Sequence, residues 1–281
     1  MTDSEIRRID IAASCRDIDS IPKVDLAGSV EKKADGTLLQ TMHNGVKVLA
    51  DTYYNRFNTE IVKRLRGHHE PQQEKAFYEV LKRIADGGVM IELGAYWGYY
   101  SLWFHKTIAL ATNYLIEPAA DNLLVGQRNF QLNGFNGHFQ RALIGKEESL
   151  DDDPPTVTVD GFVQREGLER VAILHSDIQG HEYEMLLGAT DSVQKRRFEF
   201  VFISTHGYRV HAQCLRFLRK CGYRIICEHT PGESYAVDGL IVATVDREMA
   251  PVTVSRRYAG FREWVKSSVC RMMSHIPSKC G

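Results

Sequence analysis

The chain has 281 residues and a formal net charge of −1 at pH 7, so no overall field draws it to nucleic acid or to an acidic membrane. Its 43% hydrophobic and 25% charged residues are typical of a globular protein, and no apolar run reaches the roughly 18 residues of a membrane span. The N-terminus has no apolar signal-peptide core, and the six cysteines include no C-x-x-C pair. We therefore expect a cytoplasmic protein with reduced thiols and without a zinc site, a transmembrane segment or a nucleic-acid partner.

Residues 1–86 are expected to form an N-terminal extension. Residues 1–34 are rich in charge and poor in aromatics, which predicts a weakly ordered start. Residues 35–54 hold two β-like runs around Asn44-Gly45, a dipeptide typical of a type I′ hairpin turn. Pro71 then opens a capping helix, whose apolar residues recur at helical spacing: Phe77, Val80, Leu81 and Ile84.

From residue 87 to residue 245 the pattern alternates between strands and helices. Such alternation predicts an α/β fold with a mostly parallel sheet and helices on both faces. Only a short loop separates the last two strands, so the seventh strand should run antiparallel. The predicted strands are 89–93, 112–117, 137–143, 171–177, 198–204, 223–229 and 238–245, and the helices are 99–108, 119–133, 181–189 and 210–220.

Residues 246–281 form a C-terminal tail that is basic from residue 256 on, where Arg256, Arg257, Arg262, Lys266, Arg271 and Lys279 stand against one acid, Glu263. Phe261, Trp264, Val265, Met272 and Met273 fall on one face of a predicted helix. We expect this face to pack on the domain's own core. A helix that lies on a membrane surface or binds a partner is the alternative.

Ligands of open α/β sheets bind at the carboxyl ends of the strands, where this chain places acids and small residues. Glu92, Gly94, Ala95 and Gly98 follow the first strand, and Glu117 follows the second. The glycines let a ligand approach the backbone, and an acid such as Glu117 can accept both ribose hydroxyls. These features indicate an adenosine-containing cofactor. The alternative is that both acids only cap the helices that follow them.

The loop favours S-adenosylmethionine over a dinucleotide. G-A-Y-W-G lacks the third glycine of the G-x-G-x-x-G fingerprint, and an acid just before it would repel a pyrophosphate. S-adenosylmethionine carries an ammonium group, a sulfonium and no phosphate, so Glu92 suits its amino-acid end.

Four segments in order resemble the FkbM-type class I methyltransferases: ELGAYWGYYSLWF, IEPAADNLLVGQRNFQLNG, TVDGFVQREGLERVAILHSDIQGHEYEMLLGA and DGLIVA. The resemblance covers roughly residues 87–245 and implies their Rossmann-like fold with S-adenosylmethionine as cofactor. It implies a cofactor site along these strand ends, with Glu92, Ser101 and the glycine loop at the methionine end and Glu117 at the ribose. The full implied set is Glu92, Gly94, Ala95, Tyr96, Gly98, Ser101, Glu117, Pro118, Asn122, Ala142, Leu143 and Asp177.

Departures from the family pattern concern the substrate more than the cofactor. Tyr96 and Trp97 replace smaller residues in the loop, and His175, Ser176 and His181 replace the residues usual at their positions. We expect Trp97 to pack inward and Tyr96 to face the substrate. The candidate substrate residues are Tyr96, Gln179, His181 and Tyr208.

Methyl transfer needs an acceptor atom in line with the methyl group and a group that takes its proton. Asp177 ends the fourth predicted strand and His206 follows the fifth, so Asp177 is expected to orient the acceptor and His206 to act as the base. A helix cap for Asp177 and a structural hydrogen bond for His206 are the alternatives. The pair would also bind Mg²⁺ if a third carboxylate were near.

The expected function is O-methylation of a hydroxyl on a sugar or a glycosylated or natural-product metabolite. A non-catalytic adenosylmethionine-binding protein and a nucleotide-dependent oxidoreductase are the alternatives. The acceptor molecule and the oligomeric state stay open.

Overall fold

The computed structural model describes residues 1–274, and the chain divides into two compact units, Met1–Leu143 and Ile144–Gly281. The part of the basic tail from residue 275 on, with Lys279, lies outside the described residues. The unit boundary lies inside the 87–245 domain that the sequence predicts, whose limits stay a prediction.

The first unit begins with an ordered helix, α1 (Asp3–Ala13), where a weakly ordered start was expected. Thr2 and Glu5 form a capping box: the Glu5 N–H donates to Thr2 Oγ1 at 3.2 Å, and the Thr2 N–H donates to Glu5 Oε2 at 2.6 Å. Ile9 and Ala12 are buried on its inner face. The sequence prediction was wrong here because two apolar anchors and a cap are enough to order a charged helix.

A three-stranded antiparallel sheet of β1 (Val30–Lys32), β2 (Leu38–Thr41) and β3 (Lys47–Leu49) follows and confirms the hairpin. The β2–β3 loop spans residues 42–46, because Thr41 pairs with Lys47, so the tight type I′ turn was wrong. Gly45 has a φ of 85°, the left-handed conformation that favours glycine. Side-chain amides of α5 (Ala120–Leu132) and the residue after it hold the edge strand: Asn129 and Asn133 accept from the N–H groups of Leu49 and Lys47.

Helices α2 (Asn55–Arg64) and α3 (Pro71–Leu81) complete the extension, and Phe77, Val80 and Leu81 are buried as predicted. The first unit then alternates β4 (Val89–Leu93), α4 (Tyr99–Thr107), β5 (Thr112–Ile116), α5 and β6 (His138–Gln140). These three strands are parallel, in the order β4-β5-β6.

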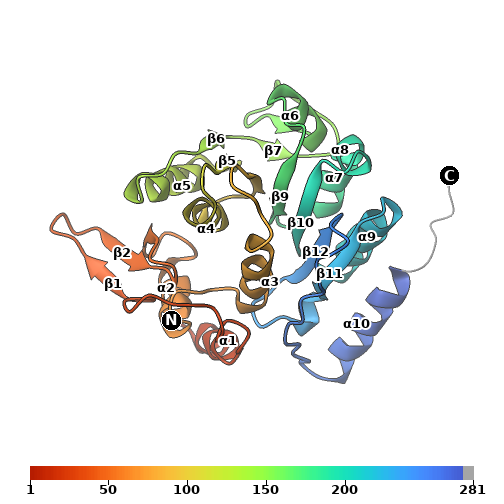
Figure 1. Cartoon of the computed structure of the whole chain (residues 1–281). Coiled ribbons are helices and arrows are strands. Elements are labelled where there is room, and N and C mark those ends of the chain that lie inside the picture. The colour runs from red at the N-terminus through yellow and green to blue at the C-terminus, as the bar shows by residue number, and fades with distance from the viewer. Residues whose placement is uncertain (275–281) are drawn as a thin grey trace. The chain divides into compact units, whose positions relative to one another are not determined.

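The second unit holds four strands of the sheet, in the order β11-β12-β10-β9. β10 (Phe198–Thr205) runs parallel to β9 (Val171–Ser176) and antiparallel to β12 (Gly239–Thr244), which is also antiparallel to β11 (Arg224–His229). Helix α9 (Tyr208–Lys220) packs on β10, β11 and β12 (Figure 1). The remaining elements are β7 (Leu143–Ile144), β8 (Thr156–Val157), α6 (Val159–Arg165), α7 (Glu182–Leu187), α8 (Thr190–Gln194), η1 (Pro231–Glu233) and α10 (Phe261–Met273).

The core strands of both units are mostly apolar and buried along nearly their whole length, as expected for strands covered on two faces. Every residue of β9 and β12 is buried, and so are Phe198, Phe200 and Phe202 of β10. Three parallel strands in one unit and a set of four with β12 reversed in the other give the seven-stranded, mostly parallel Rossmann-like sheet that the sequence predicts.

The tail helix α10 differs from expectation. Its buried residues are Ser267 and Cys270, whereas Phe261, Trp264 and Met272 are exposed, so its apolar face does not pack on the core. Polar contacts hold the opposite face instead, among them a Thr230–Ser267 hydroxyl pair at 2.6 Å. Within the described part of the chain no helix is long and apolar enough to cross a membrane, and the five cysteines found there are all free thiols.

Candidate active site

Glu92 lies near the end of β4 with its carboxylate buried at the start of α4. The Ser101 backbone N–H, in the first turn of that helix, donates to Glu92 Oε2 at 3.0 Å. Burial outweighs this hydrogen bond and raises the pKa of Glu92 to about 7. The turn between them needs its glycines, since Gly94 and Gly98 have φ values of 72° and 70°. The loop therefore keeps a carboxylate that is only half ionised near neutral pH.

Glu117 follows β5, and its carboxylate is held by three donors. The Tyr96 N–H donates to Oε2 at 3.2 Å, while the Ala119 N–H and the Asn122 amide donate to Oε1 at 3.0 and 3.3 Å. An ionised carboxylate has about four acceptor positions, so Oε2 retains one for a ribose hydroxyl. Glu92 and Glu117 thus both contact a helix start, as the helix-cap alternative requires, and Glu117 also retains acceptor capacity for a ligand.

The aromatic residues of the glycine loop pack within the first unit. Trp97 is 5% exposed, as expected, and stacks on Tyr53 with ring centroids 4.5 Å apart and 3° between the planes. Tyr96 is half-buried, and its hydroxyl donates to the Thr52 carbonyl at 2.9 Å. The substrate role of Tyr96 stays a prediction. Two further residues of the implied cofactor set differ in exposure: Ala142 is fully buried and Leu143 is exposed.

In the second unit, His206 lies among three carboxylates. Its Nδ1 is 2.8 Å from Glu182 Oε1, and its Nε2 is 3.4 Å from Asp177 Oδ1 and 3.3 Å from Asp238 Oδ1. Asp177 follows β9, His206 follows β10 and Asp238 precedes β12, so the strand ends bring them together. Glu182 is fully buried and accepts from the Gly180 N–H at 2.8 Å. The structure thus joins Asp177 to His206 as predicted and adds Glu182 and Asp238.

The charges of this cluster favour a protonated His206. Burial opposes the proton, but the hydrogen bond to Glu182 and the charges of Asp238 and Asp177 outweigh it and raise the pKa of His206 to about 9. For Glu182, burial alone would raise the pKa, but the hydrogen bonds from His206 and Gly180 prevail and lower it. At neutral pH the cluster therefore contains an imidazolium, so His206 cannot accept a further proton there.

The candidate substrate residues divide by position. Gln179 has a φ of 55°, and its amide donates to Asp177 Oδ1 at 3.2 Å, so it lies beside the cluster. His181 is exposed at the N-cap of α7. The Tyr208 hydroxyl donates to Glu263 of α10 at 2.5 Å, so it is engaged in holding the tail helix.

Comparison with known families identifies the domain. The family model described as "Methyltransferase FkbM domain" matches residues 105–225. This part of the chain resembles FkbM methyltransferase domains. The matched stretch includes Glu117, Asp177 and His206, whereas Glu92 and the glycine loop precede it. The activity class that this domain supports is S-adenosylmethionine-dependent methyl transfer.

Solved structures resemble the chain only distantly. Precorrin-6y C5,15-methyltransferase from Geobacter metallireducens is 18% identical, with 60% of this chain and 87% of that chain covered and a TM-score of 0.41. The ribosomal protein L11 methylase of Lactobacillus delbrueckii subsp. bulgaricus is 16% identical, with 64% and 81% covered and a TM-score of 0.42. M. capricolum TrmK, solved with S-adenosylhomocysteine, is 13% identical, with 60% and 67% covered and a TM-score of 0.41. None of the curated proteins compared with the chain matches it.

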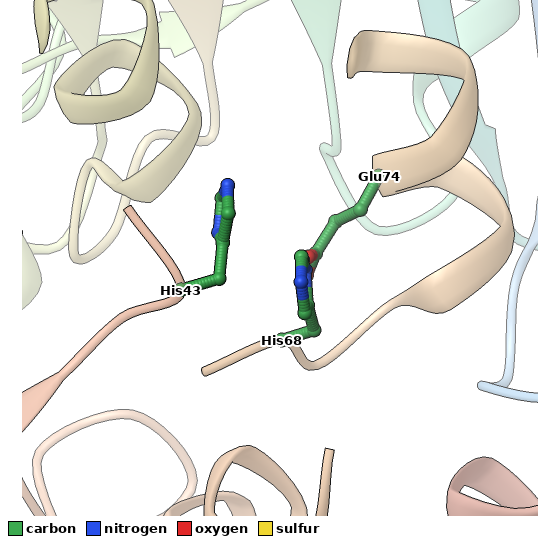
Figure 2. Close-up of side chains that lie close together, drawn as sticks. All are labelled: His43, His68 and Glu74. Atoms are coloured by element: carbon green, nitrogen blue, oxygen red, sulfur yellow. The ribbon is translucent and has the colours of Figure 1, made fainter. Parts of the chain in front are cut away.

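The N-terminal part of the chain contains a buried histidine cluster that is a candidate metal site. His43, His68 and Glu74 each offer a ligand atom within 4.8 Å of the others (Figure 2). Gly67 lets the two backbone segments approach, because a Cβ there would lie 2.2 Å from the backbone nitrogen of His43. The imidazole rings are stacked, however, with centroids 4.2 Å apart and 17° between the planes, so they do not point at one position.

Glu74 explains the cluster without a metal. Its carboxylate contacts His68 Nδ1 and accepts from the N–H groups of His69 and Glu70 at 2.8 and 3.1 Å. Burial opposes its charge, but His68 and His69 outweigh burial and hold the pKa of Glu74 well below the usual value. Burial lowers the pKa of His43 to about 3, so this ring is neutral. We interpret the cluster as a hydrogen-bonded network that fixes the start of α3.

Two members of the carboxylate cluster around His206 were not predicted from the sequence. Glu182 follows D-I-Q-G-H and looked like an ordinary acid in the first turn of a helix. Asp238 precedes the last strand, and the antiparallel direction of β12 brings the start of that strand beside the end of β10. Asp238 could have been found from the predicted reversal of the last strand. In that pairing Gly239 lies opposite Thr205, so Asp238 lies next to His206.

Proposed function

We propose that this FkbM methyltransferase transfers the methyl group of S-adenosylmethionine to a hydroxyl oxygen of a sugar or of a glycosylated or natural-product metabolite. The observation that carries the proposal is the partly exposed cluster of Asp177, His206 and Asp238 at strand ends of the second unit. Carboxylates beside an imidazolium suit a neutral, polar acceptor, because they accept its hydroxyl protons. The domain supports the methyl donor.

The cofactor role is assigned to residues of the first unit. Bound S-adenosylmethionine supplies a methyl group on a cationic sulfonium. We assign Glu92 to the ammonium group of its amino-acid end, and Glu117, which has an acceptor position left on Oε2, to the ribose. Asn122 holds the Glu117 carboxylate in place. Gly94 and Gly98, both with positive φ, shape the turn that the cofactor would approach.

In the second unit we assign proton transfer to Asp177 and positioning to His206. The acceptor oxygen gives up its proton as its bond to the methyl carbon forms, and a carboxylate within hydrogen-bond reach can take that proton. His206 keeps its own proton below about pH 9, so it serves as a fixed cation that positions Asp177 and Asp238. Glu182 orients the ring through Nδ1.

The pH dependence of turnover separates this assignment from a histidine base. Turnover is followed as S-adenosylhomocysteine released with a panel of glycosides and alcohols. With Asp177 as the acceptor of the proton, wild-type turnover stays level from pH 7 to about 9, and Asp177→Asn lowers it by roughly 10²–10⁴. Turnover that rises through about pH 9 and vanishes in His206→Gln would make His206 the base. Methylation of amines but not of alcohols would refute the hydroxyl acceptor.

A Mg²⁺-assisted version is the alternative for the same residues. Asp177 and Asp238 are oxygen ligands of the kind that Mg²⁺ prefers, whereas the imidazolium repels a cation. Turnover abolished by a chelator and restored by Mg²⁺ would establish the metal-assisted version. Tight cofactor binding without turnover on any acceptor would instead favour the non-catalytic alternative.

A further inference from the structure

The tail helix α10 is held to the second unit by polar residues on one face. Ser267, Cys270 and Ser274 are buried on this face, and the Ser267 hydroxyl pairs with Thr230. Glu263 accepts from the Tyr208 hydroxyl, and Arg271 donates to Glu228 at 3.1 Å and contacts Glu233. Figure 1 shows α10 beside α9 at the edge of this unit. The helix is therefore anchored in a fixed rotation about its axis.

The opposite face of α10 is apolar and open. Phe261 is 77% exposed, Trp264 49% and Met272 65%, and three further apolar side chains on the same helix are also exposed: Val265, Val269 and Met273. At 100° per residue these positions lie on the side of the helix away from Ser267 and Cys270. An ordinary surface helix buries such a face and exposes its polar one. We refer to these six residues as the outer stripe.

Positive charge flanks the outer stripe. Arg262 and Lys266 are exposed along one side of it, while the only acid of the helix, Glu263, is bonded to Tyr208 and Lys266. Residues 256–273 contain five arginines and lysines and one glutamate. An apolar stripe with aromatic residues and a basic flank is the pattern of helices that lie in the interface of an anionic membrane.

The size of the stripe argues against a second copy of the chain as its occupant. A helix of 13 residues is about 20 Å long and about 10 Å wide, so one face offers on the order of a few hundred Å². Stable protein interfaces bury about 800 Å² on each partner. Binding to a bilayer needs no minimum interface area, because each apolar side chain inserts independently between the lipid head groups and the acyl chains.

We propose that the outer stripe of α10 docks the protein on a membrane surface that carries anionic lipids. Phe261, Trp264 and Met272 enter the boundary between head groups and acyl chains, and Arg262 and Lys266 meet the lipid phosphates. The polar face of α10 keeps its hydrogen bonds to Glu228 and Thr230, so a helix bound to the membrane holds the second unit at the membrane as well. The proposal is independent of the proposed acceptor.

Vesicle binding of the full chain tests the proposal. The probes are vesicles of phosphatidylcholine alone and of phosphatidylcholine with phosphatidylserine. Trp264 also reports insertion, because the other two tryptophans, Trp97 and Trp103, are buried. We expect co-sedimentation with the anionic vesicles, a blue shift of the tryptophan emission, and weaker binding at high salt. The variant F261S/W264S should bind at least about tenfold more weakly, since two apolar side chains leave the lipid.

The matched control is Leu110→Ser, which removes an apolar side chain that is 87% exposed in the other unit. It should bind vesicles as the wild type does. Equal binding of wild type and F261S/W264S would overturn the proposal, and so would the absence of vesicle binding. Concentration-dependent dimers in sedimentation that F261S/W264S abolishes, without vesicle binding, would assign the stripe to a second copy. Because all substituted side chains are exposed, unchanged melting curves verify that each variant is folded.

Discussion

The carboxyl group of Glu92 should make cofactor binding depend on pH. Burial raises its pKa to about 7, so it is mostly protonated one pH unit below that value and mostly ionised one unit above. An ammonium group is attracted only by the ionised form. If binding requires that form, the apparent dissociation constant of S-adenosylmethionine falls about tenfold between roughly pH 6 and pH 8.

Isothermal titration calorimetry at several pH values measures this dependence. Glu92→Gln should bind weakly and with little pH dependence, because its amide does not titrate. Glu117→Ala is the matched control, since it removes the other strand-end acid and should keep the slope while it weakens binding. A dissociation constant that stays level in the wild type between those pH values would show that Glu92 does not face the ammonium group.

The same raised pKa has a consequence for stability. The folded protein holds the Glu92 proton more tightly than the unfolded chain, whose pKa is near 4.5. The contribution of Glu92 to the free energy of unfolding is therefore complete below about pH 4.5 and is lost as the pH rises from there to about 7. A shift of this size corresponds to on the order of 3 kcal/mol at alkaline pH. In Glu92→Gln this loss should be absent, as denaturant unfolding at pH 5 and pH 8 would show.

Three further predictions rest on single contacts. Glu117→Ala should weaken cofactor binding by about 1.5–3 kcal/mol in calorimetry, as expected for hydrogen bonds to a charged group, and equal affinity would remove it from the site. Trp97→Ala should lower the free energy of unfolding by about 3–5 kcal/mol, while Tyr96→Ala mainly raises the KM of the acceptor; the reverse pattern would exchange their roles. Glu74→Gln should cost about 3–5 kcal/mol in denaturant unfolding, because it removes the buried carboxylate that pairs with His69 and accepts from two backbone N–H groups, and a near-neutral effect would contradict the network.

The sheet could be predicted from the sequence because each strand is a short apolar run between turn residues. VMIEL became β4 at the expected residues, and the reversal of β12 followed from the short loop before it. The start of the chain could not be predicted in this way. Helix α1 depends on a cap and on two buried residues, Ile9 and Ala12, whose partners lie far along the chain.

Site residues were predictable where they end a strand and obscure where only the fold brings them together. Asp177 and His206 end neighbouring strands, so their contact followed from the α/β pattern. Glu182 comes from a helix start, and no spacing in the sequence links it to His206. Asp238 becomes a neighbour of His206 only once the reversed last strand is paired with β10. The sequence also failed to predict which face of α10 is exposed. Contacts with side chains distant in the sequence, such as Thr230 and Glu228, determine which face is buried.

Protonation was the property least visible in the sequence, and it changes the chemistry assigned to each group. Burial alone would make every inner histidine neutral, and His43, whose pKa falls to about 3, follows that rule. His206 and His69 do the opposite, since neighbouring carboxylates outweigh burial and raise their pKa values to about 9 and about 10. A histidine at a strand end looks like a base until its neighbours are known. The Nδ1 of His206 faces Glu182, and its Nε2 faces Asp177 and Asp238. His206 is therefore better suited to hold these carboxylates in place than to take a proton.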